Sequence, residues 1–331
     1  MLTYTRCLCR MHNYFFKQST RAYQIQKLYS KSKKSGGKRR MDGWLQCGKY
    51  GVFAWSISGL ETCVVVKSDE LLVAFDIGYA VRESVGCKHV FISHGHIDHV
   101  AGLPHHAAKR SLYSMSKAQY HVPTHLMEQM KSVAEGYKVM AETTEVLGQL
   151  NIIPLDDNAT VWLPNGHLVK AFPTVHRVKS QGYLVYKEHK KLKPKFVGKP
   201  GHELAVLNKQ GVDIHDITTV PELAYTGDTM MDLFLNPPTP DLLNVKVLIT
   251  EATYIDNEPG KDMIQLARKR GHQHLAEIVQ NADLFKNIQH IVLMHFSDKY
   301  STEYIRTLTS VQLPPSLREK VLLATWAKER S

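Results

Sequence analysis

Short runs of hydrophobic residues, each bounded by polar or glycine-containing turns, predict strands along most of the chain. In the first part these runs lie at residues 51–75, 151–155, 160–163, 168–172 and 182–186. Residues 101–150 have helical spacing instead, most clearly around Leu126, Met127, Met130 and Val133. The last third alternates the two patterns, with strands predicted at 245–250 and 288–294 and helices at 263–270, 274–285 and 302–310. Mixed strands flanked by helices indicate an α/β layered fold.

The densest cluster of chemically active side chains follows the buried-strand pattern at 90–92. Residues 94–99 read His-Gly-His-Ile-Asp-His, and a helix is expected to begin in the Val-Ala-Gly-Leu-Pro segment that follows. Imidazoles and carboxylates are the ligand types that zinc and similar divalent metals accept. Alternate residues of a turn can point to one side, so His94 and His96 can share one metal while Asp98 and His99 face a second. The alternative is a chance cluster in a chain with 18 histidines, and its strand-to-helix position argues against that.

Three further candidate ligands lie at the ends of other predicted strands. His176 follows the apolar run at 169–175, Asp228 follows 223–227, and His295 closes 291–294. Taken alone, each such residue is more often structural than a ligand. Their common placement, all downstream of the dense His/Asp turn, favours a single metal centre.

Together these features resemble the metallo-β-lactamase superfamily. Within it they are most similar to the short form of tRNase Z, the zinc endonuclease that trims the 3′ end of precursor tRNA, and above all to the plant-type enzymes. The resemblance spans about residues 50–325 and rests on motifs at 74–78, 91–94, 180–183, 226–229, 251–254, 271–274 and 295–297. It implies a four-layer αβ/βα sandwich with the metals at the upper edge, between two sheets. It also implies a homodimer that acts on precursor tRNA.

The resemblance implies a ligand set for two zinc ions per subunit. His94, His96 and His176 would bind one zinc, Asp98, His99 and His295 the other, and Asp228 would bridge them. A carboxylate can span two cations, and two metals can together activate a water molecule at neutral pH. Asp98 is then also the residue expected to orient that water or accept its proton.

A general acid is expected as well, because the ribose 3′-oxygen leaves poorly unless it is protonated. His272 matches the proton-donor histidine of the family, and Glu251 matches the carboxylate that orients it. His274 is the rival for this role, and a polar residue at the start of a helix is the alternative for His272.

One departure from the family pattern lies beside the first motif. Many tRNase Z sequences have Gly-Glu-Gly-Thr after the aspartate, whereas Asp76 is followed here by Ile-Gly-Tyr-Ala. Asp76 is therefore interpreted as a partner of the zinc histidines rather than as an RNA contact.

The positive charge is concentrated at the N-terminus. Residues 1–40 contain eleven Lys or Arg and no Asp or Glu, out of 42 basic and 31 acidic residues in the whole chain, so 31 of each sign remain from residue 41 on. The catalytic domain is expected over 41–331. The sequence pI of about 9.3 thus does not indicate that this domain is basic. A basic, acid-free extension over 1–40 is typical of an organellar transit peptide, and the mitochondrion is the expected destination.

Other destinations and roles for the extension stay open. A chloroplast address is one, and the basic clusters at 31–34 and 38–40 also fit nuclear localisation or a disordered RNA-binding arm. Met41 could serve as a second start, giving a nuclear or cytoplasmic product without the extension. Five cysteines without a Cys-x-x-Cys pair fit a reducing compartment, and no apolar run is long enough to span a membrane.

A second group of lysines lies at residues 187–201. This segment contains six lysines and one glutamate, together with prolines and glycines. This pattern indicates an exposed cationic loop, at the place where tRNase Z enzymes insert an arm that grips the tRNA elbow; the insertion looks short here. Phosphate contacts are expected from lysines of this loop, with a merely solvated loop as the alternative. The candidate contacts are Lys190, Lys191, Lys193 and Lys195, with Lys109 and Arg110 nearer the metal turn.

Three functions from different classes fit these observations. The favoured one is an endoribonuclease that processes the 3′ end of tRNA. The second is another hydrolase of the superfamily, such as a thioesterase or a small-molecule phosphodiesterase, which would share the seven ligands without needing Glu251 and His272. The third is an inactive RNA-binding protein of the same fold, which the complete ligand set argues against.

Overall fold

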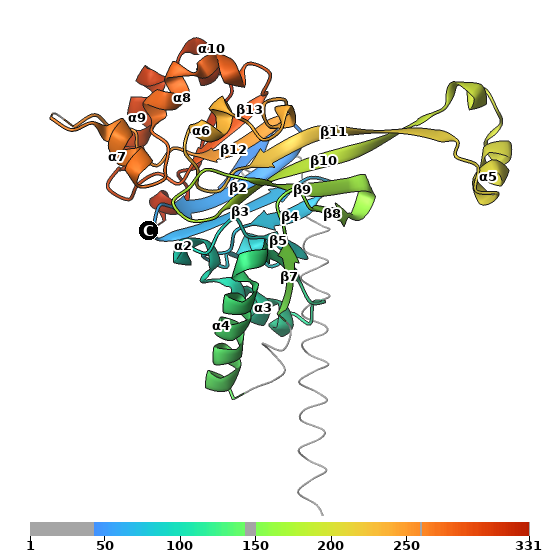
Figure 1. Ribbon diagram of the computed structural model, residues 1–331, viewed down its shortest axis with the longest axis horizontal. Helices are drawn as coiled ribbons and strands as arrows, with labels where there is room; N and C mark the ends of the chain where they lie inside the picture. Colours follow the sequence, from blue (N-terminus) through green and yellow to red (C-terminus); the bar gives the residue numbers. More distant parts are fainter. Residues whose placement is uncertain (1–42, 143–149, 259, 331) are drawn as a thin grey trace, which may run out of the picture. The chain divides into compact units, whose positions relative to one another are not determined.

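Two seven-stranded sheets form the centre of the protein (Figure 1). The computed structural model describes residues 43–142, 150–258 and 260–330, and the predicted extension over 1–40 lies outside them. The first sheet holds, in order, β1 (Trp44–Cys47), β2 (Tyr50–Ile57), β3 (Glu61–Lys67), β4 (Leu72–Phe75), β5 (His89–Phe91), β6 (Gln119–Pro123) and β7 (Asn151–Leu155). Strands β1 to β4 are antiparallel, and β4 to β7 are parallel.

The second sheet repeats this mixture of directions. It holds β8 (Thr160–Leu163), β9 (His167–Pro173), β10 (Gln181–Leu192), β11 (His215–Tyr225), β12 (Val247–Glu251), β13 (His290–Met294) and β14 (Val321–Leu323), again as neighbours in sequence order. Neighbouring strands from β8 to β11 are antiparallel, and those from β11 to β14 are parallel. In each sheet the C-terminal ends of the parallel strands therefore lie at the same edge.

Helices cover the outer face of each sheet. On the first sheet lie η2 (Arg82–Ser84), α3 (Leu103–Leu112) and η3 (Thr124–Leu126) with α4 (Met127–Met140), while the short α2 (Ile97–Val100) follows β5. On the second lie α6 (Asp232–Leu235), η6 (Pro240–Leu243), α7 (Met263–Lys269), α8 (Leu275–Gln280), η7 (Ala282–Phe285), α9 (Thr302–Gln312) and α10 (Pro315–Arg318). Short turns are also present at η4 (Pro164–Gly166) and η8 (Ala327–Glu329). The predicted four-layer αβ/βα sandwich is confirmed.

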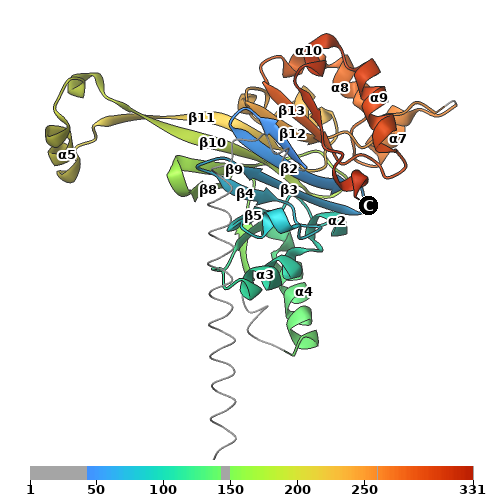
Figure 2. The same ribbon diagram turned by 180° about the vertical axis from the view of Figure 1, so that it is seen from behind.

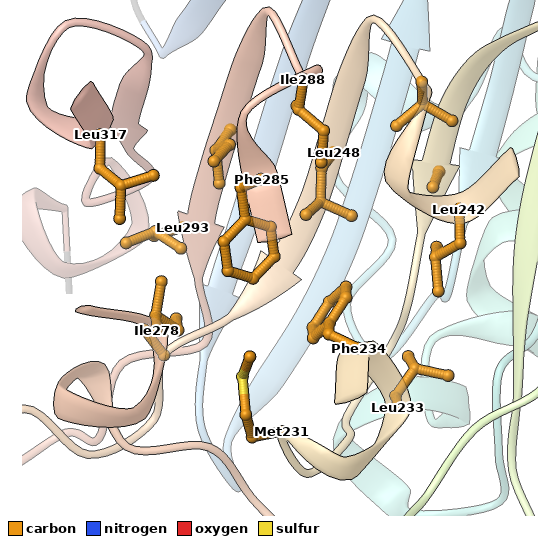
Figure 3. Packing of buried hydrophobic residues seen from close by; sticks show 14 of the residues in the cluster. Met231, Leu233, Phe234, Leu242, Leu248, Ile278, Phe285, Ile288, Leu293 and Leu317 are labelled. Atoms are coloured by element: carbon orange, nitrogen blue, oxygen red, sulfur yellow. The ribbon is translucent and has the colours of Figure 1, made fainter. Parts of the chain in front are cut away.

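The central strands bury side chains on both of their faces, which explains their continuous apolar runs. In β12, Val247 and Ile249 pack between the sheets, whereas Leu248 packs under the helices. Figure 3 shows this second layer, where Phe285 of η7 and Phe234 of α6 meet edge to face with ring centroids 5.2 Å apart. Among the described residues, no helix has the length and apolar character that crossing a membrane would require.

The structure corrects the expectation of a short cationic loop at 187–201. Strands β10 and β11 run on together past the sheet as a two-stranded arm, paired as far as Leu192 and His215, and Figures 1 and 2 show it projecting from the sandwich. The end of this arm carries η5 (Pro194–Phe196) and α5 (Gly201–Lys209). The part from 187 to 220, which we call the arm, is thus an ordered hairpin rather than a loop.

Gly78 is required where the loop after β4 meets the metal turn. A Cβ atom on Gly78 would lie 1.7 Å from the backbone oxygen of Asp98 and 2.9 Å from the backbone nitrogen of His99. Backbone atoms cannot rotate away as a flexible side chain can. The first sheet and the turn are therefore packed together with no room for a methyl group.

We predict that Gly78→Ala lowers the free energy of unfolding by about 2 kcal/mol or more, because the added methyl group must displace the metal turn. The measurement is the urea midpoint of unfolding. Gly136→Ala in α4 is the matched control, since a Cβ there meets nothing within 4 Å; it should stabilise by about 0.5–1 kcal/mol. Similar midpoint shifts for both variants would contradict the close packing of this loop.

Candidate metal centre

The candidate site residues come from the ends of strands in both sheets. Asp76 follows β4, the His94–His99 turn follows β5, and Asp228 follows β11. His176 follows β9, which runs parallel to β11 because both are antiparallel to β10. Glu251 ends β12, and His295 follows β13. One edge of the sandwich thus collects residues that are up to about two hundred positions apart in the chain.

The structure brings His94, His96, His176 and Asp228 together as one group of possible metal ligands. His94 Nε2 lies 2.9 Å from His96 Nδ1, and His176 Nε2 lies 3.4 Å from the same His96 atom. His94 Nε2 is also 3.8 Å from an oxygen of Asp228. Burial lowers the pKa of each of the three imidazoles, which favours the neutral form that binds metals.

Asp98, His99 and His295 form the second group. His99 Nε2 lies 3.4 Å from oxygens of both Asp98 and Asp228, and His295 Nε2 lies 3.3 Å from Asp98 and 3.5 Å from Asp228. Asp228 therefore contacts both groups, as expected of a bridging carboxylate. Burial alone would raise the pKa of Asp98 and of Asp228, but their histidine neighbours outweigh it and lower both values.

The donor set fits two divalent cations. Two ionised carboxylates and five imidazoles from one small volume supply the ligand types and the number that a two-metal site needs. In addition, His99 Nε2 and Asp228 Oδ1 are buried without a hydrogen-bond partner among the described residues. Unpaired buried polar atoms are costly, and cations bound between the groups would satisfy both.

Hydrogen bonds behind the ligands orient the imidazoles. His176 Nδ1 donates to the Gly271 carbonyl at 2.6 Å, and His99 Nδ1 lies 2.7 Å from the Asp76 carboxylate. His295 Nδ1 lies 3.1 Å from Thr253 Oγ1. Each of these contacts turns Nε2 towards the centre of the site. Asp76 thus lies where the sequence placed it, behind a zinc-ligand candidate.

Backbone conformation marks the same residues. Asp76 and His295 have φ values of 54° and 59°, in the left-handed region that residues other than glycine rarely adopt. Gly271, with φ of 79°, packs so closely that a Cβ would lie 2.7 Å from His176 Nδ1. For Asp76 and His295 this conformation is strained, and such strain persists where the surrounding structure fixes it.

The structure distinguishes the two rival histidines. His272 Nδ1 lies 3.1 Å from both carboxylate oxygens of Glu251 and 3.9 Å from Asp228, and its side chain is partly exposed. His274 is buried, caps α8 by accepting from the Ala276 N–H, and has its other nitrogen 2.8 Å from the Asp256 carbonyl. Both nitrogens of His274 are therefore used in the fold, which leaves His272 as the candidate acid.

The charge on His272 is controlled by Glu251. Burial alone would lower the pKa of His272, but the negative charge and hydrogen bond of Glu251 outweigh it and raise the pKa to about 9. Thr253 Oγ1 donates to Glu251 and lies 3.5 Å from His272 Nδ1. Cations bound next to Asp228 would lower this pKa towards neutrality by repulsion.

The expectation for Arg110 is wrong. Its guanidinium is buried and donates to the carbonyls of Val85, Cys87 and Ser116, so it holds α3 against the preceding loop and is not exposed to a phosphate. Lys109 is partly buried and donates to the Ala80 carbonyl at 2.5 Å. These acceptors could not be predicted, because backbone carbonyls carry no residue signature.

Two contributors to the site were missed at the sequence level. Thr253 joins Glu251, His272 and His295, and the Tyr225 hydroxyl donates to Asp76 from the core between the sheets. Thr253 lies two positions after Glu251, and this short spacing could have indicated that it belongs to the site. Tyr225 looks like an ordinary core residue of β11, and only the packing of the two sheets reveals its partner.

Comparison with known proteins agrees with this geometry. Residues 77–296 match the beta-lactamase superfamily domain, and the chain belongs to the metallo-β-lactamase superfamily. The metallo-beta-lactamase fold protein YhfI from Bacillus subtilis has the same fold, with a TM-score of 0.54 and 14% identity over 83% of this chain and 95% of that one. The short form of human tRNase Z superposes with a TM-score of 0.51 and 18% identity, over 75% and 92% of the two chains.

Sequence relatives narrow the family further. The chain is 37% identical to tRNase Z TRZ1 of Arabidopsis thaliana, over 85% of this chain and 97% of that one. It is 33% identical to the chloroplastic tRNase Z TRZ2 of the same plant, over 94% and 84%. The protein is therefore a member of the tRNase Z family.

We predict that metal binding and acid catalysis can be separated by mutation. Asp228→Asn should remove most of the bound divalent metal, since Asp228 contacts both ligand groups. His272→Ala should keep the metal and lose most activity, and His274→Ala should keep both while losing about 1 kcal/mol of stability with its helix cap. Elemental analysis, turnover and thermal unfolding are the measurements. Metal loss in His272→Ala would place that residue among the ligands instead.

Proposed function

We propose that the protein is an endoribonuclease that removes the 3′ trailer from precursor tRNA and leaves a 3′-hydroxyl on the tRNA. The observation that carries this proposal is His272, held by Glu251 beside the seven candidate ligands. A hydrolase acting on substrates with good leaving groups would not need such an acid. The tRNase Z relatives, which match most of the chain, support the same activity.

The residues divide the reaction between them. Two zinc ions per subunit, when bound, would polarise the phosphodiester and activate the attacking water. Asp98 orients that water or accepts its proton; one of its oxygens is fixed by the Gly59 N–H at 3.0 Å. His272, with Nδ1 on Glu251, delivers a proton from Nε2 to the departing ribose 3′-oxygen.

The decisive assay compares two phosphodiesters. Purified protein should cut a 3′-extended precursor tRNA after the discriminator nucleotide and should also hydrolyse bis(p-nitrophenyl) phosphate. His272→Ala should lower precursor turnover by about 10²–10⁴-fold, with far less effect on the nitrophenyl ester, whose leaving group departs unprotonated. Hydrolysis of small esters without cleavage of any precursor would move the protein to another class of hydrolase.

The arm is the proposed binding site for the body of the tRNA. It carries seven lysines against four acidic residues, while the catalytic domain as a whole has no charge surplus. Lys190 and Lys191 are exposed on β10, and Lys195 lies exposed in η5. Lys193 is paired with Asp213 at 2.6 Å, an exposed pair that a phosphate can replace at little cost. Lysines spaced along a projecting hairpin suit a polyanion that extends beyond the active site.

We predict that Lys190→Ala, Lys191→Ala and Lys195→Ala together raise KM for precursor tRNA and flatten its salt dependence by about two to three units of log K per log salt. Hydrolysis of the nitrophenyl ester should not change. The matched control removes three positive charges elsewhere, at Lys131, Lys138 and Lys286. An equal change in salt dependence for both triple variants would show a general charge effect rather than contacts from the arm.

The proposed partners and location extend this function. We propose a homodimer, which sedimentation equilibrium would measure directly. We also propose that residues 1–40 are a transit peptide for the mitochondrion, supported by their eleven basic and no acidic residues. A product that starts at Met41 would lack this address.

The extension is tested apart from catalysis. Residues 1–40 fused to a fluorescent reporter should deliver it to mitochondria, and a reporter fused behind Met41 alone should not be delivered. Deletion of residues 1–40 should leave KM for precursor tRNA and its salt dependence unchanged, because the site and the arm lie downstream. A reporter found in the nucleus would support the nuclear alternative. A weaker salt dependence after the deletion would support the RNA-binding alternative.

A further inference from the structure

Three exposed apolar side chains stand on segments whose backbone adjoins Asp98 of the metal centre. Leu60, Tyr79 and Ile97 are 59%, 44% and 74% exposed, and we call them the apolar rim. Isolated apolar residues are common on protein surfaces. Here three come from three segments that each adjoin one catalytic residue.

Each member of the apolar rim is tied to Asp98 by the backbone beside it. Ile97 precedes Asp98 in the chain. Leu60 follows Gly59, whose N–H donates to the Asp98 carboxylate at 3.0 Å. Tyr79 follows Gly78, which packs directly against the Asp98 carbonyl. The apolar rim is therefore fixed in position relative to the reacting centre.

Tyr79 is also held in a defined orientation. Its ring stacks on Trp55, with centroids 5.8 Å apart and planes inclined by 29°, and Trp55 stacks in turn on Phe53 at 6.5 Å and 15°. Trp55 and Phe53 lie on β2, in the packed layer under the first sheet. The partly exposed phenol ring thus ends a rigid aromatic stack, which costs little conformational entropy to use as a binding surface.

The opposite side of the site is cationic. Arg177 follows the ligand candidate His176 and is exposed, and Lys179 is exposed two residues further on. Arg270, also exposed, lies two residues before His272 and donates to the Tyr254 hydroxyl at 2.6 Å. By contrast, the Lys109 ammonium, on the helix that follows the metal turn, is partly buried and donates to the Ala80 carbonyl. The two sides therefore suit different parts of a nucleotide, phosphates on one and a base on the other.

We propose that the apolar rim binds the base of the first trailer nucleotide, which stacks on Tyr79. This inference rests on the proposed function. His272 lies where the ribose 3′-oxygen of the tRNA departs, so the tRNA body occupies the side of His272 and Arg270. His295 lies between His272 and Asp98, because its ring packs 5.6 Å from the His272 ring and its Nε2 lies 3.3 Å from the Asp98 carboxylate. The trailer, joined to the same phosphorus through its 5′-oxygen, extends to the remaining side.

Stacking also fits the task of the trailer site. Every base offers a π face, so an aromatic platform binds trailers of different sequence. Recognition by hydrogen bonds to base edges would restrict the set of precursors. Tyr79 therefore acts as a positioning residue for the scissile phosphate, because it holds the nucleotide on the released side.

The test combines a change in the protein with a change in the RNA, so that each RNA is measured with each protein. Precursor tRNA with a normal first trailer nucleotide is compared with one that is abasic at that position, using wild-type protein and Tyr79→Ala. Loss of the base should raise KM about fivefold or more for wild type, the lower range for one stacked base, and should have little effect in Tyr79→Ala. Tyr79→Phe keeps the ring and should behave as wild type.

Tyr137→Ala, which removes a tyrosine of similar exposure (42%) from α4, is the matched control and should respond to the abasic site as wild type does. Equal effects of the abasic site in wild type and Tyr79→Ala would overturn the inference. Failure of wild type to cut any precursor would instead refute the proposed function.

A second measurement does not depend on turnover. With 2-aminopurine as the first trailer base, binding to the His272→Ala protein should quench its fluorescence, and the Tyr79→Ala, His272→Ala double variant should not quench it. Mature tRNA, which lacks a trailer, should bind both proteins equally. Unchanged quenching in the double variant would overturn the proposal. So would conversion of a dimer to a monomer by Tyr79→Ala, since the apolar rim would then be a subunit contact.

Discussion

The buried carboxylate of Asp76 connects the parts of the protein that make the site. It accepts hydrogen bonds from the backbone N–H and the hydroxyl of Ser93, each at 2.7 Å, and lies 2.7 Å from His99 Nδ1. The Tyr225 hydroxyl reaches it from the second sheet. Hydrogen bonds to a charged acceptor contribute about 1.5–3 kcal/mol each. A single side chain thus fixes the metal turn to β4 and joins the two sheets at the edge where their strands end.

Much of the site could be predicted because its supports are buried strands. Strands covered on both faces are mostly apolar. A His or Asp that follows such a run therefore lies near a strand end, and His176, Asp228 and His295 were found in this way. Parallel direction then places these ends at one edge. The choice between His272 and His274 needed the structure, since it depends on the Asp256 carbonyl and the cap of α8, neither of which has a sequence signature.

The arm and Arg110 show where sequence patterns fail. Residues 187–192 and 215–220 are mostly polar and none of them is buried. They therefore lack the alternation of apolar and polar residues that marks a strand, and their pairing depends on the partner strand. Strand β6 was hidden for a similar reason: its five residues stand inside a long helical stretch. Arg110 looked like a surface cation because its neighbours on α3 are polar, whereas its partners are carbonyl groups of distant loops.

Gly271 links two functions that are usually considered separately. Its carbonyl accepts from Nδ1 of His176, and its own chain neighbour is His272. The left-handed backbone of this one residue therefore sets both the aim of a ligand towards the metal and the start of the segment that carries the proton donor. Substitutions in the 270–273 turn that alter the proton donor would therefore also disturb the metal ligand His176. In this protein the metal site and the range of leaving groups that His272 can protonate would thus change together.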